Sequence, residues 1–403
     1  MFIIGWVAVF RAQLPIVYLD FEGTPNGNTD IAGKFKLKDG TDSVACAVDL
    51  HIHGQTATIY EKKSFKLKLK DTKGEDLDIP LLGMRNDNSW LLDAMAVDLA
   101  RCRNRVSWDI WNEFSTPSYI AAFDKKTRNG IEGRFVEVFL NGKYWGLYCL
   151  NECMDRKQLR LRKYNAAGQC GLLVKDVYNA DFKTDLNVSK RFFTDNSKET
   201  WLLWEAKYPK RQEGEPLDWT PFVSFVHFLN MLDEETVKSH LAERIDLPVV
   251  TDVLVMNDLT HGDDNIKKNL YFYFYDINLS QMMGMTLWDM DSTWGRDFRA
   301  KTKGASTEFD TDKQNLIFDY AAAITDVGKR YAELRQSFLQ PEKLKAHFAK
   351  YFQLFRESGA AERETTRWSG RNRLTLDFEQ EEAYIMQWID DRIRYLDEKY
   401  GVR

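Results

Sequence analysis

The sequence contains no apolar run long enough to form a transmembrane helix. Its strongly apolar terminal stretch, residues 2–10, is shorter than the roughly 20 residues that cross a bilayer. Basic residues are not in excess either, because 56 Lys and Arg stand against 61 Asp and Glu, a formal net charge of −5. We therefore expect no transmembrane span and no nucleic-acid partner.

Cysteines and standard phosphate-binding motifs are also scarce. The five cysteines are an odd number without a C-x-x-C pair, which signals neither a disulfide framework nor a zinc site. The chain has no G-x-G-x-x-G or Walker A sequence, no internal repeat and no low-complexity tract. The apolar stretch at the start fits two interpretations, a signal-peptide remnant over residues 1–13 or an ordinary first strand.

Apolar and aromatic residues are abundant, at 44% and 13% of 403 residues, which is typical of a folded globular protein. In residues 61–69 apolar side chains alternate with lysines, the pattern of a half-buried strand. Two further strands flank Asn141-Gly142, a dipeptide that favours a tight type I′ turn. Between these strands, apolar residues of 90–111 recur at helical spacing and predict a helix.

The second half of the chain is mainly helical by the same criterion. Residues 176–219 are charged and only weakly periodic, and we interpret them as part of a linker or insertion. The terminal helix has one apolar stripe and ends before Gly401. Helices are predicted over residues 222–232, 234–244, 248–259, 326–339, 341–357 and 381–399.

The residues that point to chemistry lie between Asp264 and Asp291. The spacing Asp264-x-x-x-x-Asn269 equals that of the protein-kinase catalytic loop, in which Asp is the base and Asn a metal ligand. A hairpin over residues 270–288 follows, and Asp289-Met290-Asp291 stands where the metal-binding Asp of D-F-G would. A hairpin brings the residue before its first strand close to the residue after its second. We therefore expect Asp264, Asn269 and Asp289 to converge.

Each of these elements also has a purely structural interpretation. An Asp- and Asn-rich turn is usually only a turn, and D-x-D at a strand end also occurs in metal-dependent glycosyltransferases and in surface loops. The order of the elements, with a hairpin between them, favours a metal-dependent phosphoryl-transfer site.

The first half offers candidates for nucleotide contacts. Gly54 precedes a strand that carries Lys63 and Lys66, so backbone N–H groups and an ammonium could contact phosphate oxygens. Alternating lysines also protect an edge strand from aggregation. Glu152, after the Asn141-Gly142 hairpin, could border the adenine, or it could begin a loop or cap a helix.

Together these segments resemble the spore coat protein H (CotH) kinase family of atypical, secreted or surface-associated protein kinases. The resemblance covers most of the chain. It implies that Asp264 is similar to the catalytic Asp, Asn269 and Asp289 to the Mg²⁺ ligands, and Lys63 or Lys66 to the phosphate-binding lysine. The matching segments are residues 53–57, 62–66, 98–104, 139–148 with Glu152, 264–269, 288–291 and the terminal helix around Arg392 and Leu396.

We accordingly predict an α+β, two-lobed, atypical protein-kinase-like fold. Residues 14–155 form a strand-rich N-lobe, 156–220 a linker and 221–403 a helical C-lobe, with ATP held between the lobes. The expected function is transfer of the γ-phosphoryl group of ATP, with Mg²⁺ or Mn²⁺, to a hydroxyl of a protein Ser or Thr. Asp291 assists the metal ligands in this hypothesis.

Two alternatives from other classes stay open. One is a pseudokinase that serves as a structural or binding protein of an envelope layer, favoured by His53 and residues 55–57, which depart from the family's glycine-loop pattern. The other is a glycosyltransferase that uses Asp289 and Asp291, although it leaves the Asp264/Asn269 spacing unexplained. The resemblance implies a secreted or envelope-associated protein, and a cytoplasmic location also stays open.

Overall fold

The computed structural model describes residues 13–27, 29–54, 59–165, 170–176, 200–201, 204–210, 217–308, 315–371 and 374–402. These residues form two compact units, each assembled from separated stretches of the chain. The barrel unit combines the described parts of Met1–Cys102, Gly133–Glu152 and Ala346–Ala383. The sheet–helix unit combines those of Arg103–Glu132, Cys153–Lys345 and Tyr384–Arg403.

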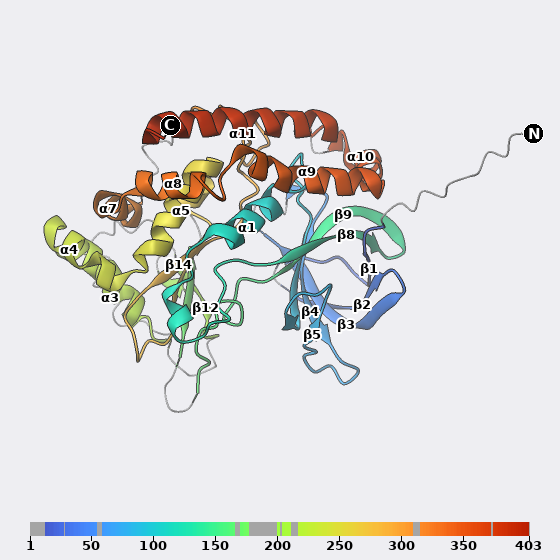
Figure 1. The fold of residues 1–403 in the computed structure, drawn as a ribbon. Helices are drawn as coiled ribbons and strands as arrows, with labels where there is room; N and C mark the ends of the chain where they lie inside the picture. The colour runs from blue at the N-terminus through green and yellow to red at the C-terminus, as the bar shows by residue number, and fades with distance from the viewer. Residues whose placement is uncertain are drawn as a thin grey trace, which may run out of the picture. The chain divides into compact units, whose positions relative to one another are not determined.

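The barrel unit is built on a closed sheet with strand order β1-β2-β3-β4-β7-β9-β8 (Figure 1). Neighbouring strands are antiparallel, except that β1 closes the barrel by pairing in parallel with β8. A short ribbon of β5 (Ile79–Pro80) and β6 (Asn86–Asp87) accompanies it. The barrel strands are β1 (Ile16–Phe21), β2 (Ile31–Asp39), β3 (Asp42–His53), β4 (Ser64–Lys70), β7 (Ser89–Asp93), β8 (Gly133–Leu140) and β9 (Lys143–Glu152).

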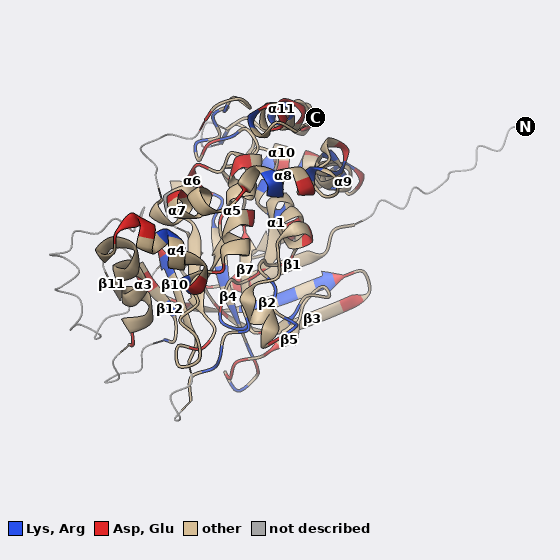
Figure 2. Cartoon of the chain, turned by 60° about the vertical axis from the view of Figure 1, so that its left-hand side comes forward, with Lys and Arg blue, Asp and Glu red and all other residues tan. Residues whose placement is uncertain are grey.

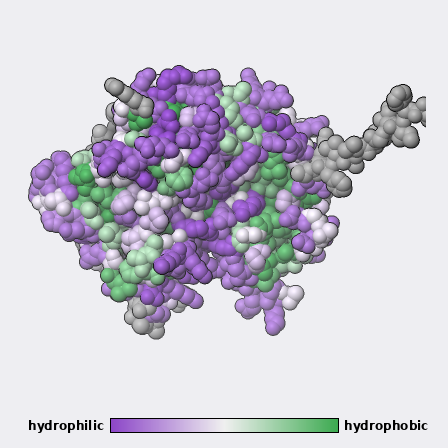
Figure 3. Space-filling view, in the orientation of Figure 1, coloured by the Kyte–Doolittle hydropathy of each residue, from purple (hydrophilic) through white to green (hydrophobic). Residues whose placement is uncertain are grey.

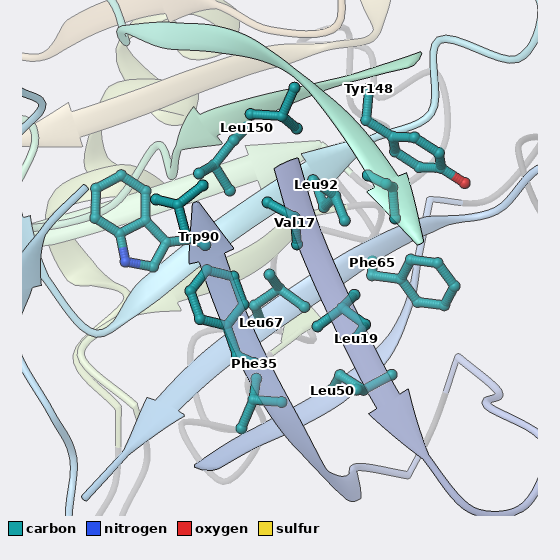
Figure 4. Close-up of a cluster of buried hydrophobic side chains, with 14 of the residues drawn as sticks. Val17, Leu19, Phe35, Leu50, Phe65, Leu67, Trp90, Leu92, Tyr148 and Leu150 are labelled. Carbon is teal, nitrogen blue, oxygen red and sulfur yellow. The ribbon is translucent and has the colours of Figure 1, made fainter. Parts of the chain in front are cut away.

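Period-two alternation decides which side chains enter the barrel. On β4, Phe65, Leu67 and Leu69 are buried and the lysines between them are half-buried, which confirms the predicted pattern. Lysines also alternate with apolar residues along β2, where they form blue bands in Figure 2. Figure 4 shows the inward side chains of several strands converging on one apolar core. Burial of this core is the main favourable term for closing the sheet.

The tight turn between β8 and β9 also matches the sequence prediction. Asn141 and Gly142 have φ of 48° and 74°, and Leu140 pairs directly with Lys143 across a two-residue loop. Both turn residues are therefore left-handed, as a type I′ turn requires.

The helix predicted over residues 90–111 is wrong in its first half. Residues 89–93 form β7, which pairs with β4 on one side and β9 on the other, and Trp90, Leu91 and Leu92 are all buried. A strand inside a sheet can be apolar at successive positions, so the spacing alone does not separate it from a helix. Met95 and Arg101 have positive φ, and the helix begins only after them, as α1 (Arg103–Phe114).

Helix α10 (Ala360–Trp368) lies along β9 and is anchored by one buried carboxylate (Figure 1). Glu364 Oε1 accepts hydrogen bonds from Lys62 Nζ at 2.7 Å and from Arg101 Nε at 2.8 Å. Glu364 Oε2 accepts one from the Leu147 amide at 2.7 Å. Gly146 has φ of 136°, and a Cβ at this position would lie 2.5 Å from Glu364 Oε2. Only glycine lets β9 approach the helix this closely.

The sheet–helix unit contains an antiparallel sheet of order β11-β12-β10-β13-β14. Helix α5 packs on β14, and α7 and α8 pack on α5. The strands are β10 (Leu172–Asp176), β11 (Thr200–Trp201), β12 (Trp204–Tyr208), β13 (Leu270–Phe274) and β14 (Gly284–Leu287). The helices are α1, α3 (Thr220–Met231), α4 (Glu234–Arg244), α5 (Leu247–Thr260), α6 (Asp264–Lys267), α7 (Leu316–Ile324) and α8 (Val327–Arg335), with a 3₁₀ turn at Tyr119–Ala122.

The two long C-terminal helices, α9 (Pro341–Glu357) and α11 (Phe378–Tyr400), each contribute to both units. The predicted stripe of α11 is buried, and the face of this helix along the top of Figure 3 is mainly hydrophilic. The chain is therefore α+β, strand-rich in its N-terminal region and helical in its C-terminal region, as predicted. Across the described ranges, no helix combines the length and the apolar character needed to span a bilayer.

We expect Glu364→Gln to destabilise the protein strongly. The amide cannot balance the charges of Lys62 and Arg101, which stay buried, so the free energy of unfolding should fall by about 3–5 kcal/mol. Urea unfolding measures this change. Glu382→Gln, which removes a more exposed pair with Arg356, is the control and should cost less than about 1 kcal/mol. Equal losses for the two variants would contradict the proposed role of Glu364.

Lys62 should make stability depend on pH. Burial lowers the pKa of Lys62 from 10.5 to about 7, with Glu364 opposing the shift and Arg101 adding to it. Between these values the unfolded chain holds a proton that the folded chain has released. The contribution of Lys62 to the free energy of unfolding should therefore rise as the pH increases from about 7 to 10.5, by at most about 1.4 kcal/mol per pH unit.

The variant Lys62→Met removes the titrating amine and leaves Arg101 paired with Glu364. Urea unfolding of both proteins at pH 7, 8 and 9 isolates the effect, because other titrating groups cancel in the difference. A difference that stays constant with pH would show that Lys62 remains protonated in the folded chain.

Candidate functional site

The predicted catalytic loop follows α5. His261 ends this helix in the left-handed region, with φ of 52°, and its amide donates to the Asn257 carbonyl. Gly262 and Asp263 lead into the short helix α6, which starts at Asp264. The loop therefore turns sharply at the helix end, and Asp264 lies in its first helical turn.

The predicted metal ligands flank the hairpin that follows the loop. Leu270 pairs with Leu287, so Asn269 directly precedes the first residue of β13 and Asp289 is the second residue after the end of β14. Both residues are left-handed, with φ of 60° at Asn269 and 52° at Asp289. The hairpin predicted from the sequence is confirmed.

A buried amide holds the loop against this hairpin. Asn265 Nδ2 donates to the Trp288 carbonyl at 2.6 Å and makes a longer contact of 3.5 Å with the Asn269 carbonyl. Asn257 Nδ2 in turn donates to the Asn265 carbonyl at 3.1 Å. Asn265 was not predicted, because one amide in an Asp- and Asn-rich turn has no distinguishing sequence pattern.

The two adjacent carboxylates of the loop have different partners. Asp263 forms an ion pair with Lys303 at 2.7 Å, and Lys303 also donates to the His261 carbonyl. Asp264, in the described part of the chain, makes only a longer contact of 3.9 Å with Lys268. Asp264 is therefore the loop carboxylate better placed to accept a proton or a hydrogen bond from a ligand.

The second pair of carboxylates follows β14. Asp289 is exposed and Asp291 is half-buried, and Asp291 Oδ1 accepts a hydrogen bond from Ser292 Oγ at 3.0 Å. Between them, the Met290 amide donates to Asn104 Oδ1 on α1 at 3.0 Å. Over the described residues, no group of three or more His, Cys, Asp or Glu side chains is arranged to hold a metal ion.

Lys175 on β10 is a second residue that sequence reasoning missed. Its ammonium lies over the rings of Tyr271 and Trp288, at 5.6 and 6.0 Å from their centroids. Burial lowers the pKa of Lys175, and the charge of Asp289 opposes that shift. A cation therefore accompanies the carboxylates that follow β14. The available signal was a lysine that directly follows the apolar residues 172–174 of the same strand.

The predicted nucleotide-binding residues lie in the barrel unit, apart in sequence from the catalytic loop. Gly54 is exposed with φ of 98° at the end of β3, and Lys63 and Lys66 are half-buried. Glu152 is fully buried in β9, where Glu152 Oε1 accepts a hydrogen bond from the Arg85 amide at 3.1 Å. Neither structural alternative for Glu152 holds, because it neither begins a loop nor caps a helix. Residues 55–57 of the glycine element lie outside the described residues.

Comparison with known proteins gives the family. Residues 50–396 match the family model described as CotH kinase protein, so the chain belongs to the CotH kinase protein family. The chain is also similar to the inner spore coat protein H of Bacillus subtilis (strain 168), with 24% identity over 258 residues. The alignment covers 64% of this chain and 62% of that protein, which is less than two thirds of the relative.

We expect Asn265→Ala to loosen the catalytic loop. The substitution leaves the buried Trp288 carbonyl without its donor, which should lower the free energy of unfolding by about 1–3 kcal/mol in a urea titration. Asn278→Ala, at an exposed amide in the turn of the same hairpin, is the matched control and should cost less. An Asn265→Ala protein as stable as the control would show that the amide does not hold the loop.

Proposed function

We propose that this protein is a phosphotransferase that uses ATP and a divalent metal, Mg²⁺ or Mn²⁺, and transfers the γ-phosphoryl group to a Ser or Thr hydroxyl of a protein. The observation that carries the proposal is the register of the β13–β14 hairpin. Asn269 directly precedes the first strand of this hairpin, and Asp289 follows its second strand. The loop before the hairpin carries Asp264, which has no short ion pair in the described chain. Membership of the CotH kinase protein family supports the same reaction class.

In this proposal Asp264 orients the acceptor hydroxyl and accepts its proton. Asn269 and Asp289 supply amide and carboxylate oxygens, the ligand type that Mg²⁺ prefers, and Asp291 assists from the same turn. A metal bound there would neutralise charge on the phosphates. Phosphoryl transfer requires little covalent chemistry from the protein. In this proposal the main contribution of the chain is therefore to position the catalytic loop through the Asn265 contacts.

The phosphate-binding cation has three candidates. Lys63 and Lys66 are those of the sequence hypothesis, and Lys175 adds one from the same unit as Asp289. We also propose that the barrel unit corresponds to the N-lobe of a kinase-like fold and the sheet–helix unit to the C-lobe.

A second candidate function is a structural protein of an envelope layer. It is favoured by one observation, that the relative carries the name of an inner spore coat protein. The same name supports an envelope-associated location for this chain. Both functions can coexist, and turnover of ATP separates a kinase from a purely structural member. No feature of the described residues favours the glycosyltransferase.

Two substitutions should separate metal binding from catalysis. Asp289→Ala should lose both the thermal shift induced by ATP with Mn²⁺ and phosphoryl transfer, because ligand-induced stabilisation follows affinity. Asp264→Ala should keep most of the thermal shift and lose transfer by about 10²-fold or more, the typical contribution of a general base. Melting curves and autophosphorylation measured on the same samples give both readouts.

Asp319→Asn, at an exposed carboxylate of α7, serves as the control and should change neither readout. Near-normal transfer by Asp264→Ala would remove the catalytic loop from the proposal. Absence of any shift with millimolar ATP and metal, on folded wild-type protein, would favour the structural function.

A further inference from the structure

The barrel unit carries a cavity that the proposed function does not use. Its volume is about 560 Å³, and it is lined by residues of α10, by Arg371 just after that helix, and by the start of β9. This volume lies within the range of small-ligand sites in proteins, roughly 300–1,000 Å³. Its lining includes Lys143, Glu362, Arg363, Thr366, Arg367 and Arg371.

Two of these residues repeat the same charge along one face of α10, and a third arginine lies just beyond the end of that helix. Arg363 and Arg367 are four residues apart in α10, so their side chains project from the same side of the helix. Arg371 follows after the chain leaves the helix at Ser369 and Gly370. Like charges at this spacing destabilise an isolated helix. Helix stability therefore does not explain this pair of arginines.

The outer two arginines are neutralised within the barrel unit. Arg363 makes a two-point ion pair with Glu137 of β8, at 2.7 and 2.8 Å. Arg371 Nη1 contacts both carboxylate oxygens of Glu61, at 2.8 and 2.7 Å. These two cations are satisfied and contribute little net charge to the cavity.

The middle arginine has no such partner. The Arg367 guanidinium lies 4.7 Å from the ring centroid of Trp145 and 4.9 Å from that of Trp368. Arg367 Nε is buried without a hydrogen-bond acceptor. Within the described ranges neither Arg367 nor the exposed Lys143 has a carboxylate partner. The two indole rings hold the guanidinium in place, so little side-chain entropy is left to lose when an anion binds.

We propose that this cavity binds a phosphate monoester, with the guanidinium of Arg367 and the ammonium of Lys143 as its cationic contacts. A guanidinium presents paired N–H donors that match phosphate oxygens, and the Thr366 hydroxyl adds a donor on the same helix face.

The charge of the cavity selects a single phosphate over a polyanion. After the two internal ion pairs, Lys143 and Arg367 face Glu362, so two positive charges and one negative charge leave one net positive charge among the described lining residues. A phosphate monoester carries about −1.5 to −2 at neutral pH. A nucleic acid or other polyanion would need a more extended basic surface.

The size of the cavity favours a phosphate that is attached to a larger group. A volume of about 560 Å³ leaves room beyond a single phosphate ion. The proposal commits to a phosphoserine or phosphothreonine side chain of a protein segment, and free inorganic phosphate is the other source of the same chemistry.

The test is fluorescence anisotropy with the full chain and a labelled Gly-Ser peptide that carries one phosphoserine, beside the same peptide without phosphate. Arg367→Gln should weaken binding of the phosphopeptide by about tenfold or more, because hydrogen bonds to charged groups contribute about 1.5–3 kcal/mol. Lys143→Gln, at an exposed position, should weaken it several-fold and tests the site even if Arg367→Gln disturbs folding. Arg394→Gln, an exposed arginine of α11 that pairs with Asp391, is the control and should leave binding unchanged.

Equal affinity for the two peptides, or unchanged affinity in both Arg367→Gln and Lys143→Gln, would overturn the proposal. The proposal would also be overturned if inorganic phosphate competed as tightly as the phosphopeptide, because the ligand would then be a free ion and not a protein segment. The assay contains no ATP and no metal. Its outcome is therefore independent of whether the chain transfers phosphate.

Discussion

The barrel unit depends on a single buried carboxylate. Glu364 accepts hydrogen bonds from three parts of the chain. The donors are Lys62 in the segment before β4, Arg101 in the segment before α1, and the amide of Leu147 in β9. The two side-chain partners lie 302 and 263 residues away along the chain. Each of these charges alone would be costly to bury, and together they are largely compensated. The same contact explains why position 146 must be glycine, since any larger residue would displace the carboxylate from the strand.

The candidate catalytic loop is shaped by backbone conformation more than by charge. His261, Asn269 and Asp289 all adopt positive φ, and they stand at the points where the chain leaves α5, enters β13 and leaves β14. Asparagine and aspartate tolerate this conformation better than most residues, and their side chains are also the ones that can bind a metal. The Asn265 amide then joins the loop to the hairpin through backbone carbonyls. In the proposed reaction, these contacts would position the acceptor hydroxyl.

Much of the fold could be predicted because its signals are local. The lysine alternation of β4, the Asn141-Gly142 turn and the helices α4 and α9 follow from short patterns, and these two helices have the predicted bounds. The helix over 90–111 was mispredicted because a strand in the middle of a sheet is apolar on both faces. Helix α10 was missed because its buried residues include Glu364, so polarity hides its inward face.

The candidate site was also predictable only where its signals are local. The spacing of Asp264, Asn269 and Asp289 and the hairpin between them are visible in the sequence, and their catalytic and metal-binding roles remain predictions. The contribution of Asn265, the pairing of Asp263 with Lys303 and the position of Lys175 depend on residues distant in the chain. The burial of Glu152 depends on the whole sheet around β9. No local pattern encodes such contacts.

The way the barrel closes has a consequence for how the chain is made. Its first strand pairs in parallel with β8, more than a hundred residues later, and the carboxylate that neutralises Lys62 and Arg101 belongs to residue 364. During synthesis, at about 5–20 residues per second, the N-terminal strands emerge long before that residue does. Until then two cations next to the sheet lack their counter-charge, and the α10 side of β9 is uncovered. The barrel unit therefore cannot complete its buried ion pairs until residue 364 has been synthesised, although its strands are among the first to leave the ribosome.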